Sequence, residues 1–142
     1  MTSHLRARDL LWFTGDELGE MRRALASGNW NLAVRRGQEV LETSVKAVLL
    51  HLGGDYPKSH DPVPALRLVL GKRGHSVDEQ RLERIGAASR DLAKKRGPAG
   101  YVEILCTEAE GRAAAEAAED TFLLATEICG PPPPGPFRPG AA

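Results

Sequence analysis

The sequence predicts an all-α protein, an up-and-down bundle of four to five helices. Apolar residues recur every three or four positions through several stretches, which is the spacing of a helix face. No stretch keeps the polar–apolar alternation of a strand. Glycines and prolines separate the helical stretches, so the connections should be short. Helices joined in this way bury their apolar stripes against one another.

The chain has 142 residues, about the size of one domain. We expect a helical domain over residues 1–129 and a proline-rich tail over residues 130–142. The tail reads GPPPPGPFRPGAA, and its prolines lack the backbone donor that helices and sheets need. A disordered or polyproline conformation is therefore expected for it.

The first two helices are predicted from the clearest periodicity. The first runs from Leu5 to Ala26, and the second from Trp30 to Leu52. Asn29 is a suitable N-cap for the second helix, because its side-chain oxygen can accept from the first turn. Gly53 and Gly54 should end this helix, since glycine adopts the left-handed conformation at little cost.

Two more helices are expected in the middle of the chain, and the first of these two is short. Asp61 is predicted to cap the third, with Pro62 at its first position. Ser76 and Glu79 have the spacing of a capping box, which should start the fourth helix. That helix is expected to end near residues 97–98, a Gly-Pro pair.

Thr107 and Glu110 repeat the capping-box spacing and should start the last helix. This helix is rich in alanine, so another backbone can approach it closely. We expect it to be a central packing helix, and a subunit contact remains the alternative. The two stripes concerned are Ala113, Ala117, Thr121, Leu124 and Ile128, and beside them Ala114, Ala118, Phe122, Ala125 and Cys129.

Charge is balanced overall and uneven along the chain. Lys plus Arg and Asp plus Glu each number 19. From Leu66 to Arg96 there are nine basic and four acidic residues, a balance of +5, and from Glu103 to Glu127 one basic and seven acidic, a balance of −6. We expect these segments to complement each other within the bundle, because charge runs usually form solvated faces.

Several functional classes are disfavoured by what the sequence lacks. Cys106 and Cys129 are too far apart for a CxxC motif, which fits a reduced, cytoplasmic protein. No apolar run approaches the roughly 20 residues of a membrane helix. Phosphate-loop, HExxH and GxSxG motifs are absent. We therefore expect no cofactor, no metal site and no membrane contact.

Residues 30–62 read WNLAVRRGQEVLETSVKAVLLHLGGDYPKSHDP. This stretch resembles the HEPN family, in which a Glu, three residues and a Lys on the second helix precede a loop ending in His and Asp. Glu42, Lys46, His60 and Asp61 match that pattern and are our ligand-binding candidates. Relatives often have adjacent Arg and Tyr after the fourth helix, whereas KKRGPAGY separates the two here.

The resemblance implies a function as well as a fold. HEPN domains are similar to the helical, substrate-binding domain of aminoglycoside nucleotidyltransferases and are often paired with a separate minimal nucleotidyltransferase. It thus implies a homodimer that partners such an enzyme and binds a nucleotide or substrate. A purely structural interpretation stays open: Glu42 and Lys46 as an ion pair, His60 fixing its loop and Asp61 capping a helix.

Active HEPN proteins resemble metal-independent ribonucleases with an Arg, four to six residues and a His. No histidine here has that spacing, so no catalytic residue is assigned and an enzyme is disfavoured. The alternatives are a divergent RNA-targeting toxin or defence ribonuclease, as in toxin–antitoxin pairs, and an adaptor that uses its alanine face and tail. The candidate RNA phosphate contacts are Arg67, Arg73, His75, Arg90 and Arg96.

Overall fold

The computed structural model describes residues 3–55, 57–101 and 104–132. All regular structure in this part of the chain is helical, as predicted. The helices are α1 (Ser3–Ala26), α2 (Trp30–His51), α3 (Val63–Arg73), α4 (Glu79–Tyr101) and α5 (Glu108–Cys129).

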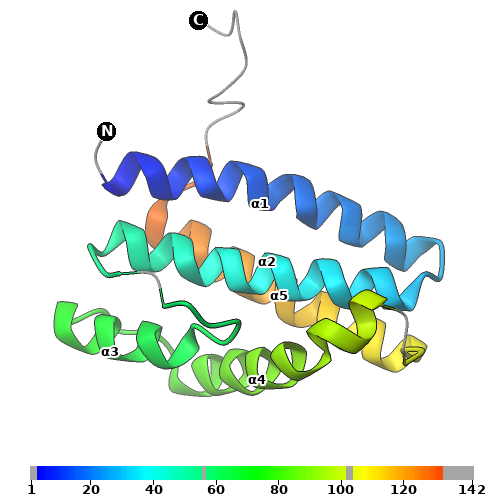
Figure 1. The fold of residues 1–142 in the computed structure, drawn as a ribbon. Coiled ribbons are helices and arrows are strands. Elements are labelled where there is room, and N and C mark those ends of the chain that lie inside the picture. Colours follow the sequence, from blue (N-terminus) through cyan, green and yellow to red (C-terminus); the bar gives the residue numbers. More distant parts are fainter. Residues whose placement is uncertain (1–2, 56, 102–103, 133–142) are drawn as a thin grey trace, which may run out of the picture.

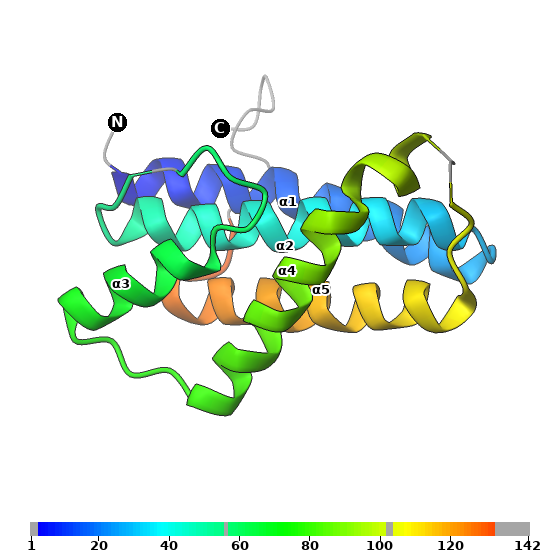
Figure 2. The same cartoon turned by 60° about the horizontal axis from the view of Figure 1, so that its bottom comes forward.

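The central element is α2, which packs against every other helix. Figure 1 shows α1 on one side of α2 and α5, with α3 and α4 on the other. Successive long helices reverse direction, so the bundle runs up and down with the short α3 inserted between α2 and α4. In Figure 2, α4 crosses the others obliquely, whereas α2 and α5 lie nearly side by side.

The core follows the apolar stripe of α2. Its side chains face the four other helices, so the buried face of α2 is wide and includes polar positions such as Ser44. Burying one leucine or valine contributes about 1.5–3 kcal/mol to stability. The fully buried large side chains of α2 are Val34, Val40, Leu41, Val45, Val48 and Leu49.

Helices α2 and α5 are in close contact at Gly37 of α2. A Cβ atom built there would lie 3.1 Å from the backbone oxygen of Ala114 on α5. Ala114, Ala118 and Ala125 are buried in the same helix pair. The prediction that α5 packs centrally is therefore confirmed, although Ala113 on its outer side is exposed.

Two of the predicted helix caps are confirmed. The Asn29 side chain accepts a hydrogen bond from the Leu32 backbone N–H at 3.2 Å. Thr107 and Glu110 form the complete capping box at the start of α5. Gly53 also has the predicted left-handed conformation, with φ of 78°.

The predicted start and end of α4 are wrong. The helix begins at Glu79, and the Asp78 carbonyl accepts its first hydrogen bond from Leu82. Ser76 lies too early in the chain to cap it. At the other end α4 continues through residues 97–98 to Tyr101, and Figure 2 shows it bending before its last turns. A proline bends a helix without always ending it.

The basic and acidic segments meet where α4 packs against α5. Arg81 contacts Asp120 and Glu127, each at 2.8 Å. Lys95 lies 3.1 Å from Glu110. These ion pairs confirm that the segments complement each other. Each pair is partly exposed, so its individual contribution should be at most about 1 kcal/mol.

Helix α5 ends at Cys129, and the division into a helical domain over residues 1–129 and a tail over residues 130–142 stays a prediction. The expectation of a disordered or polyproline tail falls mainly on residues 133–142, which lie outside the described residues, and it stays a prediction. Glu103 of the acidic segment also lies outside them. No helix in the described part of the chain is long and apolar enough to cross a membrane.

Candidate functional site

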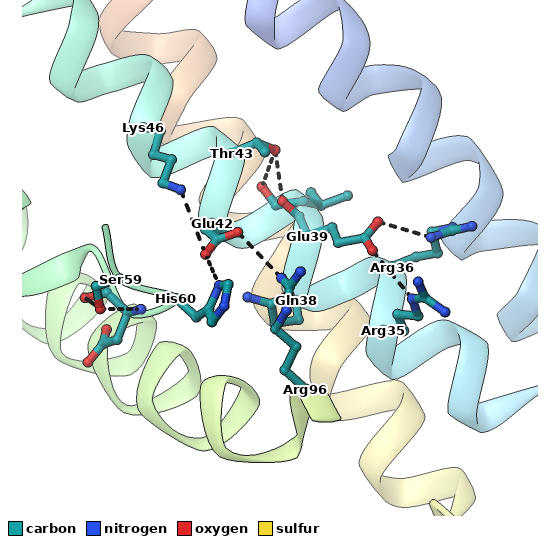
Figure 3. A network of polar contacts seen from close by, with 12 residues as sticks. Arg35, Arg36, Gln38, Glu39, Glu42, Thr43, Lys46, Ser59, His60 and Arg96 are labelled. Carbon is teal, nitrogen blue, oxygen red and sulfur yellow. Dashed lines mark hydrogen bonds and ion pairs between the residues drawn. The ribbon is translucent and has the colours of Figure 1, made fainter. Parts of the chain in front are cut away.

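The Glu42 carboxylate is the centre of a polar cluster on α2. Its side chain is only 9% exposed, because neighbouring chain segments cover it. Nδ1 of His60 lies 2.7 Å from Oε1, and since a carboxylate only accepts, the ring nitrogen is the donor. Nζ of Lys46 lies 3.8 Å from the same oxygen. Figure 3 shows these side chains converging on Glu42.

Arg96 joins the cluster from α4. One guanidinium nitrogen lies 3.8 Å from Oε2 of Glu42 and donates to the side-chain oxygen of Gln38 at 3.1 Å. Gln38 is 3% exposed, and its Nε2 has no hydrogen-bond partner among the described residues. We call Gln38, Glu42, Lys46, His60 and Arg96 the Glu42 cluster.

Asp61 does not belong to this cluster. Its Oδ1 accepts a hydrogen bond from the Ser89 hydroxyl on α4 at 2.5 Å. The predicted helix cap is wrong, because Pro62 holds the N-cap position of α3 and no side chain caps that helix. His60 and Asp61 therefore fix the α2–α3 connection in two directions, toward α2 and toward α4.

Comparison with known families gives this arrangement a context. A family model for the HEPN domain matches residues 8–129. The chain belongs to the HEPN family. No curated protein and no solved structure matches it. HEPN membership implies at most a role related to nucleotides or RNA, or association with a nucleotidyltransferase.

The four residues that match the HEPN pattern therefore do not form one site, because they lie in two separate groups of contacts. Glu42, Lys46 and His60 meet, whereas Asp61 turns to Ser89. Sequence reasoning missed Gln38, although it lies one turn before Glu42 on the same face of α2. The sequence predicts Arg96 only as an RNA contact, because nothing local indicates that α4 returns to this point of α2.

The other RNA-contact candidates do not gather into a site. Arg67 donates to Glu79 at 2.6 Å and so links α3 to α4. His75 lies in the exposed connection between these helices. Arg73 and Arg90 are exposed on α3 and α4 respectively. The candidates are therefore spread over α3, α4 and the connection between these two helices.

Neither cysteine has the properties of a nucleophile. Burial raises the pKa of the Cys129 thiol to about 12, and burial together with the nearby Glu110 raises the pKa of Cys106. Both shifts disfavour the reactive thiolate. Among the described residues, no three His, Cys, Asp or Glu side chains gather in a way that could hold a metal ion.

The bond between Ser89 and Asp61 gives a first prediction. Replacing Ser89 by alanine should lower the free energy of unfolding by about 1 kcal/mol, because Asp61 loses its hydrogen bond. Urea unfolding followed by circular dichroism measures this. Ser76→Ala, in the exposed connection before α4, is the matched control and should change stability by less than about 0.5 kcal/mol. Equal losses of stability in the two variants would show that the Ser89–Asp61 hydrogen bond does not stabilise the fold.

Proposed function

We propose that this HEPN protein is a noncatalytic partner of a minimal nucleotidyltransferase, and that its Glu42 cluster forms part of a nucleotide- or substrate-binding surface. The observation that supports this most is the convergence of three basic side chains on one buried carboxylate, in a chain without the ribonuclease spacing. The cluster combines side chains from α2, the α2–α3 connection and α4.

The charges of the cluster favour an anionic ligand. Lys46 and Arg96 are cations, and Glu42 offsets only one of them. The basic side chains are 21%, 55% and 41% exposed for Lys46, His60 and Arg96, so they reach solvent while Glu42 does not. Hydrogen bonds from such groups to phosphate are short and strong.

The buried carboxylate also positions the basic groups before any ligand arrives. Glu42 holds its partners from both of its oxygens, Oε1 and Oε2. Binding then costs less side-chain ordering, since each immobilised long side chain otherwise costs about 0.5–1.5 kcal/mol. This supports a preformed binding surface for phosphate-bearing molecules.

Coexpression and calorimetry test the proposal. The tagged protein is coexpressed with a minimal nucleotidyltransferase, and copurification in a defined ratio is expected. ATP titrated into the purified complex should bind, and Lys46→Ala should weaken binding about tenfold, which is about 1.4 kcal/mol. Lys58→Ala, an exposed lysine outside the cluster, is the matched control and should leave binding unchanged.

A homodimer is part of the same proposal, and light scattering on the purified protein measures it. A monomer that neither copurifies with the enzyme nor releases heat with ATP would refute the assignment. If Lys46→Ala and Lys58→Ala affect ATP binding equally, the partnership with the enzyme still holds. The Glu42 cluster is then not part of the nucleotide-binding surface.

A further inference from the structure

Gln38 carries a buried hydrogen-bond donor that stays unused in the described part of the chain. The residue is only 3% exposed, yet its Nε2 has no partner among the described residues. Buried polar groups in folded proteins are nearly always paired, because an unpaired group has lost its bonds to water without replacement. An unpaired amide nitrogen inside a polar cluster therefore needs a specific explanation.

The orientation of this amide follows from its contact with Arg96. One guanidinium nitrogen of Arg96 donates to Oε1 of Gln38 at 3.1 Å. A guanidinium has donors and no acceptor, so the amide atom that faces it must be the oxygen. Turning the amide over would bring two donors together. The contact with Arg96 thus leaves both N–H groups of Nε2 for another acceptor.

The amide has a fixed place in the bundle, whereas the guanidinium reaches solvent. Gln38 directly follows Gly37, where a Cβ atom would lie 3.1 Å from the Ala114 backbone oxygen of α5. The backbone of α2 therefore has no room to move toward α5 at this point. The Arg96 side chain, in contrast, is 41% exposed. Figure 3 shows the Gln38 and Arg96 side chains together, next to Glu42.

We propose that Gln38 and Arg96 form an oxyanion subsite within the Glu42 cluster, and that this subsite holds one phosphate group of the ligand. The inference rests on the function proposed above and names the group by which the ligand is recognised. Both side chains offer only donors to the ligand, so the ligand must supply the acceptors. The donors converge from two helices, α2 and α4, and a single group with several acceptor oxygens serves both.

A phosphate group meets these requirements. A guanidinium has five N–H donors in a planar fork and can bind two phosphate oxygens at once. One of these donors is engaged by Oε1 of Gln38, and the others serve the ligand. When the outer bonds of the long Arg96 side chain rotate toward solvent, a further phosphate oxygen can accept from Nε2. Binding then satisfies the donor that is unpaired in the free protein.

Nuclear magnetic resonance on the full-length, ¹⁵N-labelled protein tests the subsite, with inorganic phosphate as the probe. Phosphate should move the side-chain N–H signals of Gln38 downfield until they saturate, because Nε2 gains an acceptor. The side-chain signals of Gln80, which is exposed on α4, are the matched control and should stay in place. Sodium chloride at the same ionic strength should move neither set of signals, since it screens charge without supplying an oxyanion.

Gln38→Leu identifies the Gln38 signals by their loss and tests the affinity. Leucine has a similar size and no polar atom, so the fold should persist, and circular dichroism checks the helix content. The variant should bind phosphate about tenfold more weakly, because the ligand loses a donor and Arg96 loses the oxygen that orients it. Gln80→Leu should bind phosphate as the parent does.

Two results would overturn the subsite. Phosphate could move the Gln38 signals no more than those of Gln80, or Gln38→Leu could bind phosphate as tightly as the parent. If ATP still binds the complex and Lys46→Ala still weakens that binding, the proposed function then stands without this subsite. Saturating shifts of the Gln38 signals in a protein that fails to copurify with a nucleotidyltransferase would support the subsite and contradict the partnership.

Discussion

Replacing Gly37 by valine should lower the free energy of unfolding by about 3 kcal/mol. The glycine is buried where α2 crosses α5, and even a Cβ atom would come within 3.1 Å of the Ala114 backbone oxygen. Backbone cannot move aside as the end of a flexible side chain can, so the two central helices must separate. Forcing extra atoms into a packed core costs about 1–3 kcal/mol, and this site is at the upper end.

Gly71→Val is the matched control for this prediction. Gly71 is also helical, in α3, and a Cβ there would meet no atom within 4 Å. Its replacement should change stability by less than about 0.5 kcal/mol, since glycine and valine differ little in helix propensity. Urea unfolding compares both variants with the parent. Similar destabilisation by the two would contradict the close α2–α5 contact.

Raising the pH from 5 to 8.5 should destabilise the protein through one carboxyl pair. Burial, then the hydrogen bond and charge of Glu39, raise the pKa of Glu17 from 4.5 to about 8, and Glu20 adds to this while Arg36 opposes it. Burial opposes ionisation of Glu39 too, but its contacts with Glu17, Arg36 and Arg35 prevail and lower its pKa. The pair therefore holds one proton at neutral pH.

The direction follows from proton binding. Between pH 4.5 and 8 the folded protein keeps the Glu17 proton that the unfolded chain has released, so stability falls as pH rises through this window. Below pH 4.5 Glu17 is protonated in both the folded and the unfolded protein, and its full contribution to stability is present. Above pH 8 Glu17 must be ionised with one buried oxygen that has no partner among the described residues. The contribution is then lost.

Glu17→Gln isolates this effect. The amide is neutral at every pH and can still donate to Glu39, so the stability of the variant should vary less between pH 5 and 8.5. At pH 8.5 it should exceed the parent by about 2 kcal/mol, a value reduced to allow for the partial exposure of Glu17. Glu116→Gln, an exposed carboxylate of α5, is the control. Parallel stability curves for parent and Glu17→Gln would contradict the shared proton.

The helices that could be predicted best are those whose ends depend on neighbouring residues alone. Asn29 and the Thr107–Glu110 box cap their helices as expected, because the partner atoms lie within three residues. The prediction failed at Asp61 because a distant hydroxyl, that of Ser89, competes for the same carboxylate. Residues 97–98 were expected to end α4, but a Gly-Pro pair weakens a helix without fixing its end.

The candidate site was predictable only in part for a similar reason. Glu42 and Lys46 are four residues apart on one helix, so their contact follows from the chain itself. His60 was included through the HEPN resemblance. Gln38 and Arg96 were not grouped with them, since their bond joins positions 58 residues apart and depends on how α4 crosses α2.

The sequence by itself determined an all-α bundle, because the spacing of apolar residues decides which face of each helix leaves water. Tertiary structure alone decided which polar side chains meet: Arg96 with Glu42, Asp61 with Ser89, and Glu17 with Glu39. The physical reason is range. Apolar burial needs only a face of the right width, whereas an ion pair or hydrogen bond needs two particular atoms within about 3–4 Å, and helix crossing sets that distance.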